Sequence, residues 1–275
     1  VEHEQYSSRL FIDFHNKRFN LLTYSGKIEK MIKNTITLCK KYDIGKILTI
    51  VPQEDEPEFL RHGFVREAVI DGYFRGKNGI DLAYYYDRAR ARSSKTREED
   101  EIIRHVKEAA GQFNPMQNSP FHFRSAQLED ANELAQLYDA VFKTYPTPLH
   151  EADYIKNVIR KNQVFFKVAE FNGKIVSAAS ADLNHEYLNA EITDCATNPD
   201  FRRRGLLSEL VYYLEDDLQE MGYMTLFSVA RAASPGINTV FSKHGYRYAG
   251  RRINNSNIMG SLEDMNIWVK RIASE

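Results

Sequence analysis

Hydrophobic and polar residues follow a regular pattern in the second half of the chain, from residue 121 onward. The segment "FHFRSA" alternates at every second position, which predicts a strand, whereas "LEDANELAQLYDAVF" repeats its apolar residues at helical spacing. The pattern continues with a helix in "YIKNVIRKN", a hairpin in "VFFKVAEFNGKIVSAASADLN" that turns at Asn172–Gly173, and a strand in "YLNAEITDCAT". Helix and strand then alternate through "LLSELVYYLEDDLQEMG", "TLFSVAR" and "GINTVFSKHG", and two strands follow. This order predicts an α/β (α+β) fold with a mixed central sheet flanked by helices.

A linker at residues 91–120 separates this region from an N-terminal region at residues 1–90. Around it the sequence changes from mixed charge in "RARARSSKTREEDE" to a loop rich in Pro, Asn and Ser in "FNPMQNSP". Four apolar residues at helical spacing predict one short amphipathic helix: Ile102, Ile103, Val106 and Ala110. We expect the charges of the linker to be solvated, and we place the second domain at residues 121–275.

The composition is that of an ordinary soluble globular protein, with 43% hydrophobic and 27% charged residues in 275. A formal net charge of -1 gives no global reason to expect a nucleic acid or an anionic membrane as partner. Cys39 and Cys195 lie far apart, and no leader or apolar run of bilayer length is present, so we expect a cytoplasmic protein. His185 and His244 lack partners at metal-ligand spacing, and we expect no metal.

Three consecutive arginines precede one of the predicted helices, in "TNPDFRRRGLLSEL". The first N–H groups of a helix are unpaired, and the helix dipole favours an anion there. Arg202, Arg203 and Arg204 add positive charge, and Gly205 lets backbone approach closely. Three cations at this end of a dipole are unfavourable unless something negative binds, so we expect a pyrophosphate. The alternative is a basic first turn without a ligand.

The order of these elements resembles the acetyl-CoA-binding core of the GNAT (Gcn5-related) N-acetyltransferases, over roughly residues 121–272. The resemblance rests on Pro199-x-x-Arg202-x-x-Gly205 between strand and helix, and on "KHGY" later in the chain. The combination of "ITDCATNPDFRRRGL", "SPGIN", "NNSNIMG" and "EDMNIW" looks like the β-lysine N-acetyltransferases, which make the osmolyte N6-acetyl-β-lysine. The resemblance implies a GNAT fold, acetyl-CoA as donor and a small-molecule amine as acceptor.

The resemblance also implies a set of cofactor-binding residues. These are Ala196, Thr197, Arg202, Arg203, Arg204, Gly205, Leu206, Leu207, Ser234, Asn238 and Phe241. Leu207 stands where the family usually has a small residue. The family's usual acid Tyr falls on Phe241, which cannot donate a proton, and its usual Asn falls on Ser234, with Asn238 close enough to substitute. A water therefore protonates the leaving thiolate, or the thiolate leaves unassisted.

The N-terminal region repeats the second half of the chain. Residues 59–64, "FLRHGF", mirror residues 241–246, "FSKHGY", and the flanking elements follow the same predicted order. The first copy has no Arg-x-x-Gly loop, so we expect it to bind no cofactor. We interpret it as a degenerate GNAT-like half that completes the sheet or buries one wall, with chance similarity as the alternative.

An alkylammonium acceptor has a pKa near 10.4 and needs a base before it can attack a thioester. Glu191 is the first candidate, because several GNAT enzymes carry a catalytic Glu on the strand before the phosphate loop. The alternative is a strand Glu that faces solvent. Asp194 is the second candidate, although a regular pleat would place it on the opposite face of the sheet. It could also bind a second ammonium of the substrate or hydrogen-bond the turn.

Substrate contacts are predicted from position along the chain. Tyr145 lies in the loop where GNAT proteins admit the acceptor, and an acceptor carboxylate would suit an arginine. The remaining candidates are Arg231, Arg251 or Arg252 for the carboxylate, and Asn254 and Asn255 for a polar pocket. The alternative for the arginines is plain surface charge, and the alternative for the asparagines is a hairpin turn.

We therefore expect an acetyl-CoA-dependent N-acetyltransferase that acts on the terminal amine of β-lysine. The alternatives are another small amine acceptor, such as a polyamine or lysine, and a non-catalytic acetyl-CoA-binding protein. The sequence gives no oligomeric state.

Overall fold

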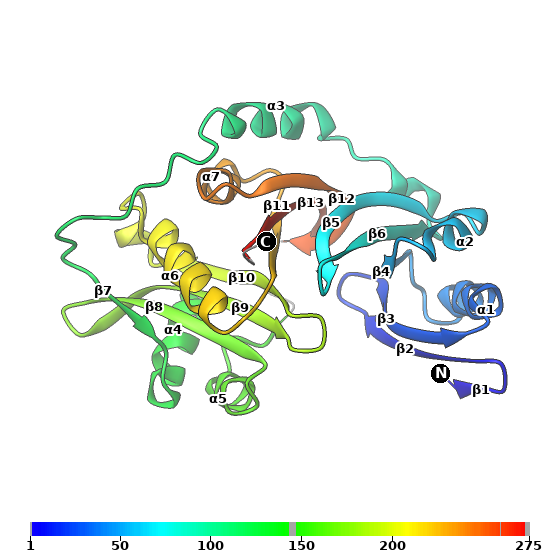
Figure 1. The fold of residues 1–275 in the computed structure, drawn as a ribbon, viewed down its shortest axis with the longest axis horizontal. Helices are drawn as coiled ribbons and strands as arrows, with labels where there is room; N and C mark the ends of the chain where they lie inside the picture. Colours follow the sequence, from blue (N-terminus) through cyan, green and yellow to red (C-terminus); the bar gives the residue numbers. More distant parts are fainter. Residues whose placement is uncertain (1, 143–146, 259, 273–275) are drawn as a thin grey trace.

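One sheet of thirteen strands runs through both halves of the chain (Figure 1). The computed structural model describes residues 2–142, 147–258 and 260–272. Within them the strands are β1 (Glu2–His3), β2 (Tyr6–Asp13), β3 (Arg18–Gly26), β4 (Lys46–Pro52), β5 (Val65–Phe74), β6 (Lys77–Tyr85), β7 (His122–Ser125), β8 (Val164–Phe171), β9 (Lys174–Asn184), β10 (Asn189–Thr197), β11 (Thr225–Arg231), β12 (Arg247–Ile258) and β13 (Ser261–Arg271). The helices are α1 (Ile28–Lys41), α2 (Glu56–Arg61), α3 (Thr96–Lys107), α4 (Ala131–Val141), α5 (Ala152–Arg160), α6 (Leu206–Glu220) and α7 (Pro235–Lys243). The strand order is β1-β2-β3-β4-β6-β5-β12-β13-β11-β10-β9-β8-β7.

The two halves of this sheet have the same internal order, β2-β3-β4-β6-β5 in the first and β9-β10-β11-β13-β12 in the second. Each contains one parallel pair, β3 with β4 and β10 with β11. Helices α1 and α2 occupy the chain positions that α6 and α7 occupy in the second half. The mixed sheet and the GNAT-like first half agree with the prediction from the repeated sequence.

The halves join where the equivalent strands β5 and β12 pair antiparallel, with Gly250 opposite Ala68. A Cβ atom on Gly250 would lie 2.0 Å from the carbonyl oxygen of Glu67. Only glycine can therefore occupy this position without moving the backbone.

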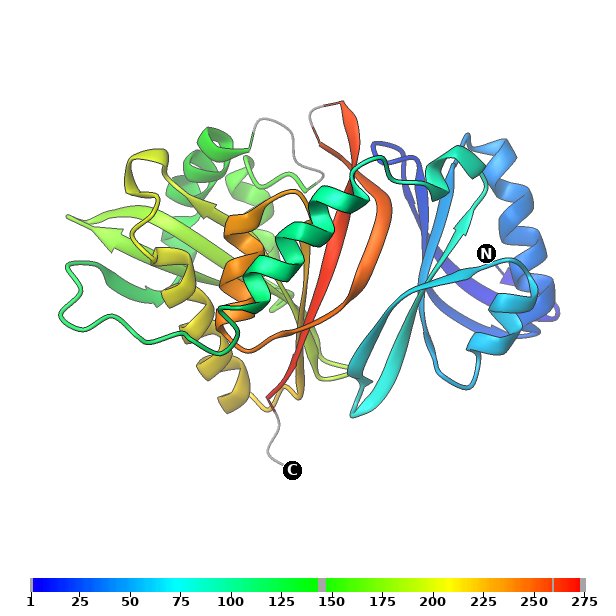
Figure 2. The same ribbon diagram turned by 90° about the horizontal axis from the view of Figure 1, so that it is seen from above.

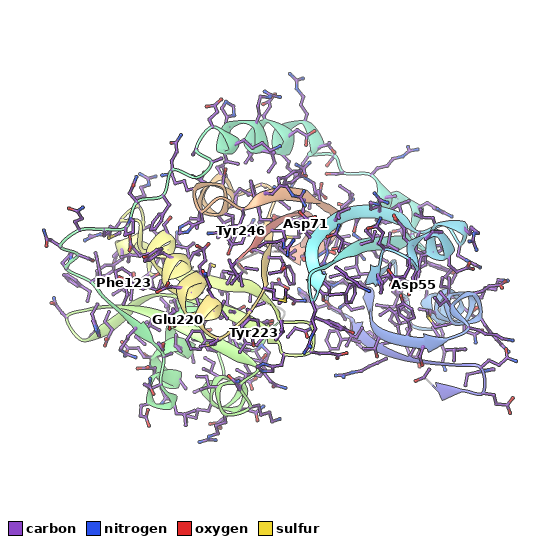
Figure 3. All side chains as sticks on the ribbon, in the orientation of Figure 1. Asp55, Asp71, Phe123, Glu220, Tyr223 and Tyr246 are labelled. Carbon is purple, nitrogen blue, oxygen red and sulfur yellow. The ribbon has the colours of Figure 1, made fainter. Side chains whose placement is uncertain are left out.

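The β5–β6 hairpin crosses the junction and contacts the start of strands β10 and β11. The Thr225 hydroxyl donates to the carbonyl of Asp71 at 3.1 Å, and the Asn189 amide donates to the carbonyl of Tyr73 at 2.7 Å. The Asp71 carboxylate, labelled in Figure 3, accepts from Arg247 at the start of β12. These contacts fix the hairpin of the first half against the second half.

Helices cover both faces of the second half of the sheet. Helices α4 and α5 pack on one face, and α3, α6 and α7 pack with the apolar core of the other (Figure 2). Helix α3 belongs to the linker but lies along α7, where the Ser242 hydroxyl donates to the carbonyl of Val106 at 2.6 Å. The linker contains the predicted helix, which ends at Lys107, before Ala110. The expectation that the linker charges are solvated is wrong for Glu99, which is buried beside Arg251.

Within the described ranges, we find no helix that combines the length and the apolar character needed to cross a bilayer.

Candidate active site

Strands β10 and β11 separate along their length and leave a wedge in the sheet. They pair only from Asn189 opposite Thr225 to Glu191 opposite Phe227. Beyond that point β10 continues along β9 to Thr197, and β11 continues along β13. The two facing edges therefore expose main-chain groups that pair with no strand, which suits the binding of an extended polar ligand.

A bulge in β10 turns Asp194 toward the face that carries Glu191. The register with β9 shifts between Thr193 and Ala196, and Asp194 has a positive φ of 49°. The Ser180 hydroxyl donates to Asp194 Oδ2 at 2.7 Å, and Ser180 lies on the same face as Glu191 because it pairs with Thr193. The expectation that Asp194 faces the opposite side is wrong, because the extra residue of a bulge reverses the alternation.

Glu191 and Asp194 border a cavity of about 430 Å³ at the base of the wedge. Asp182, the register partner of Glu191 on β9, is the third carboxylate of its lining. The full lining is Tyr73, Thr147, Leu149, Tyr154, Val158, Gln163, Val164, Phe166, Asp182, Leu183, Asn184, Asn189, Glu191, Asp194 and Phe227. These described residues include no lysine or arginine, so the cavity offers negative charge and aromatic rings to a cation.

The surroundings of Glu191 in the cavity give it a pKa suited to proton transfer. Burial raises the pKa of Glu191 to about 7, with the charge of Arg252 acting against this rise and that of Asp194 adding to it. Burial and the charges of Asp194 and Glu191 also raise the pKa of Asp182, although water reaches this side chain. No described residue donates a hydrogen bond to either carboxylate, so both are available to a ligand.

The loop between β10 and α6 presents the first N–H groups of the helix and three exposed arginines. Gly205 precedes the helix in the left-handed conformation with a φ of 77°, and Arg203 is also left-handed. Arg202, Arg203 and Arg204 are exposed, and none pairs with a carboxylate in the part of the chain that the structure describes. Arg204 donates to the carbonyl of Asp200 at 3.4 Å and lies over the ring of Phe201, so its guanidinium is held at the loop. A helix N-terminus beside three exposed guanidinium groups fits the pyrophosphate of acetyl-CoA.

Four predicted cofactor contacts have side chains that point into the core or the sheet. Ala196, Leu206 and Phe241 are at most 2% exposed, and Leu207 packs against the core between β10 and α6. Leu206 can contact a cofactor only through its backbone, whereas the side chain of Leu207 stays partly exposed. Phe241 has no exposed surface for such a contact, because its ring packs against Tyr246.

Asn238 cannot substitute for a cofactor-binding Asn, because its side chain is fully used inside the protein. Its amide donates to the carbonyls of Arg231 and Ser234, and its oxygen accepts from Asn266 and Trp268, all at 2.7–2.9 Å. Asn238 is a structural residue that joins α7 to β11 and β13. Ser234 and Thr197 remain partly exposed and stay predictions.

The arginines predicted to bind a carboxylate are already engaged by acidic residues. Arg231 makes two hydrogen bonds with Glu263, at 2.8 and 3.0 Å. Arg252 pairs with the buried Asp81 at 2.7 Å, and none of the three candidates lines the cavity. Arg251 pairs with acidic residues of α3.

The predicted polar pocket at Asn254 and Asn255 is instead a contact between the halves. The Asn254 amide donates to the carbonyls of Arg90 and Arg92, and the carbonyl of the buried Asn255 accepts from Arg18. Tyr145 lies outside the described residues.

Sequence reasoning missed Asp182, Tyr154, Phe227 and Tyr73 as cavity residues. The segment "SADLN" places the acidic residue Asp182 on a predicted strand, so the sequence did mark it as a candidate. The partner of Asp182 on the next strand could not be inferred, because the register depends on the loop that joins β9 to β10.

Comparisons with known proteins place this geometry in one family. The model of the acetyltransferase (GNAT) family matches residues 131–246, which include the wedge, the bulge and the arginine loop. N-acetyltransferase YodP of Bacillus subtilis is 36% identical over 94% of this chain and 94% of that protein. A beta-lysine N(6)-acetyltransferase of Methanosarcina mazei is 33% identical over 91% of this chain and 100% of that protein.

Among solved structures, an N-acetyltransferase from Staphylococcus aureus Mu50 covers 56% of this chain and 100% of its own length, with a TM-score of 0.51 and 20% identity. This similarity concerns the fold alone. With relatives of more than 30% identity along nearly the whole chain and a family model over its catalytic core, the chain belongs to the GNAT family of acetyltransferases.

Proposed function

We propose that this protein transfers the acetyl group of acetyl-CoA to the N6 amine of β-lysine and forms N6-acetyl-β-lysine, a compatible solute. Acetyl transfer from acetyl-CoA follows from its family. The acceptor is supported by the similarity to beta-lysine N(6)-acetyltransferases. The observation that carries the proposal is the cavity with three carboxylates beside the wedge, because it matches an acceptor with two ammonium groups.

The donor side is formed by the arginine loop and the wedge. Acetyl-CoA supplies the acetyl group as a thioester, whose C–S bond breaks as the new C–N bond forms. Arg202, Arg203 and Arg204 hold the pyrophosphate together with the first N–H groups of α6. The unpaired edges of β10 and β11 line the path from this loop to the cavity.

The acceptor side recognises a cation by charge and by aromatic contact. β-Lysine carries two ammonium groups and one carboxylate, so its net charge is positive. Asp182 and Asp194 hold the ammonium at C3, and Tyr154 and Phe227 contact the alkyl chain. The carboxylate of the acceptor points toward the mouth, because the described lining contains no cation to receive it.

Glu191 accepts the proton that N6 must lose before it can attack. Its pKa of about 7 keeps roughly half of the side chain ionised at neutral pH, which suits a general base. Desolvation in the cavity disfavours the charged amine, whereas the carboxylates favour it, so N6 needs Glu191 to take its proton. Glu191 then releases the proton to water.

A second candidate is a polyamine acceptor. The described lining contains no lysine or arginine. Such a lining suits an acceptor without a carboxylate, and it equally suits an acceptor whose carboxylate faces solvent. Spermidine is therefore the direct competitor of β-lysine in the assay.

The test measures release of the CoA thiol from acetyl-CoA with β-lysine, α-lysine, spermidine and no acceptor. We expect the highest kcat/KM with β-lysine, and NMR of the product should place the acetyl group on N6. Asp182→Asn should raise the KM for β-lysine about tenfold or more, through loss of a charge-assisted contact.

Asp153→Asn is the matched control, because this acid of the adjacent helix α5 has a side chain that is 97% exposed. A preference for spermidine or acetylation at N3 would contradict the proposed acceptor. Equal effects of both substitutions would remove Asp182 from the recognition of the amine.

A further inference from the structure

The two halves of the sheet exchange the same kind of contact across their junction. Lys46 Nζ donates to the carbonyl of Ile253 at 2.8 Å, and Arg18 donates to the carbonyl of Asn255 at 3.1 Å. Lys46 and Arg18 begin the parallel pair of the first half, as Thr225 and Asn189 begin that of the second. The β12–β13 hairpin therefore meets the first half as the β5–β6 hairpin meets the second.

Asn255 and Tyr73 are equivalent in this arrangement. Each lies five residues after the residue of its strand that pairs at the junction, Gly250 for Asn255 and Ala68 for Tyr73. Their surroundings differ. Asn255 is 1% exposed, and the charged side chains of Arg18 and Arg90 donate to its carbonyl. Tyr73 borders the cavity that contains Glu191. The first half thus has a filled junction, whereas the second half has an open one with an aromatic residue from the first half in its wall.

The position of Tyr73 is fixed by several independent contacts. Its ring centroid lies 5.7 Å from that of Phe227, the residue that pairs with Glu191 across β10 and β11. The Asn189 amide holds its carbonyl, and Arg75 of the same hairpin donates to the carbonyl of Glu186 at 2.6 Å. The Tyr73 hydroxyl makes no hydrogen bond within the described ranges, so contacts of the ring and the backbone determine its place.

We propose that Tyr73 of the N-terminal half is a specificity-determining residue of the acceptor cavity, where its ring forms the wall beside Glu191 and Phe227. An aromatic ring at this point contacts the alkyl chain of the acceptor and attracts its ammonium group through the π face. The N-terminal half is thereby part of the active site. This inference rests on the proposed function only in requiring a cationic amine as acceptor.

The test compares Tyr73→Ala and Tyr73→Phe with the wild-type enzyme. Tyr73→Ala should raise the KM for the acceptor about tenfold or more, leave the KM for acetyl-CoA within about twofold, and improve bulkier amines relative to β-lysine. Tyr73→Phe keeps the ring and should retain the wild-type preference. If Tyr73→Ala does not fold, Tyr73→Leu replaces it, because leucine keeps the junction apolar but removes the ring.

Phe74→Ala is the matched control. The Phe74 ring lies next to Tyr73 on the same hairpin, with ring centroids 4.9 Å apart, and 4.8 Å from Tyr187 in the turn between β9 and β10, but Phe74 does not line the cavity. We expect this variant to keep the acceptor KM within about twofold. An equal effect of Phe74→Ala and Tyr73→Ala would overturn the inference, because the cause would then be loss of hairpin packing.

The reference acceptor in this test is whichever amine the wild-type enzyme acetylates best. If that amine is not β-lysine, the proposed acceptor fails while the role of Tyr73 is still tested. If β-lysine is best but Tyr73→Ala leaves the acceptor KM and the order of preference unchanged, the role of Tyr73 fails and the proposed function stands.

Discussion

Glu191 and Asp182 face each other as register partners on the antiparallel strands β10 and β9. Like charges directly opposite each other destabilise a sheet, and no described residue donates a hydrogen bond to either carboxylate. Asp194 lies on the same face because of the bulge. The folded protein therefore holds a cluster of negative charge that a bound cation would relieve.

Removal of either charge should stabilise the protein at high pH. The pKa of Glu191 in the folded state is about 7, against an ordinary value of 4.5, so the folded state binds more protons than the unfolded state between these values. Stability should thus fall as pH rises through this window. We expect Glu191→Gln to raise the free energy of unfolding at pH 8 by on the order of 1–3 kcal/mol, and to give no gain at pH 4.

Thermal unfolding of wild type and variant at both pH values measures this difference. Glu220→Gln is the control, because Glu220 is an exposed acid at the end of α6 (Figure 3). A lower melting temperature for Glu191→Gln than for wild type at pH 8 would show that the carboxylate stabilises the fold.

Arg202→Ala should weaken acetyl-CoA binding about tenfold while leaving the fold intact, because one charge-assisted contact to phosphate is lost. Calorimetry with acetyl-CoA measures the change. Arg9→Ala removes the same charge from an exposed position on β2 of the first half and should have no effect. Unchanged affinity in Arg202→Ala would exclude this residue from the phosphate site.

Each chain should bind one acetyl-CoA. The first half passes from β3 to α1 through "SGK", without an Arg-x-x-Gly loop, and its junction is filled by buried charged side chains. Calorimetric stoichiometry gives the number of sites. Two equivalents per chain would contradict the interpretation of the first half as free of cofactor.

The sequence predicted those parts of the fold that depend on local patterns and on the repeat. The correspondence of residues 59–64 with residues 241–246 anticipated that α2 and α7 are equivalent, and the arginines before Gly205 anticipated the loop at α6. Hydrophobic periodicity and helix-start signals are local, so they can be read from the sequence without knowledge of the tertiary structure.

The cavity could not be predicted in the same way, because its residues meet through long-range register. Asp182 faces Glu191 only through the pairing of β9 with β10, and Asp194 joins them only because of the bulge. Tyr73 enters through the pairing of β5 with β12, two strands that lie far apart in sequence. Asn238 had the expected residue type near the expected position, but burial committed it to four internal hydrogen bonds.

Asn238→Ala should destabilise the protein without affecting the cofactor. The substitution leaves the indole N–H of Trp268 and the amide of Asn266 without their acceptor, and each buried unsatisfied group costs about 1–3 kcal/mol. We expect a loss of about 2–4 kcal/mol in chemical denaturation, with the KM for acetyl-CoA within about twofold of wild type.

Thr239→Ala, on the exposed side of the same helix, should change stability by no more than about 0.5 kcal/mol. If Asn238→Ala instead kept full stability and lost acetyl-CoA affinity, Asn238 would be a cofactor ligand after all.

Glu191→Gln tests the base directly, because glutamine keeps the size of the side chain but cannot take the proton. Loss of a positioned base typically lowers turnover about 10²–10⁴-fold, whereas acetyl-CoA affinity should stay near the wild-type value. In the wild type, kcat/KM should rise with pH through about 7 as Glu191 ionises. The variant should lack this step and recover part of its rate toward pH 10, where the free amine forms in solution.

That recovery at high pH separates a base from a residue that only holds the substrate, since lost binding would not be restored by free amine. Asp194→Asn is the comparison, because Asp194 lies on the same face and accepts from Ser180. A Glu191→Gln rate near wild type at pH 7, together with a large loss in Asp194→Asn, would transfer the role of base to Asp194. If both variants lose most of their turnover and only Glu191→Gln recovers at high pH, Glu191 is the residue that accepts the proton and Asp194 is a residue that binds the substrate.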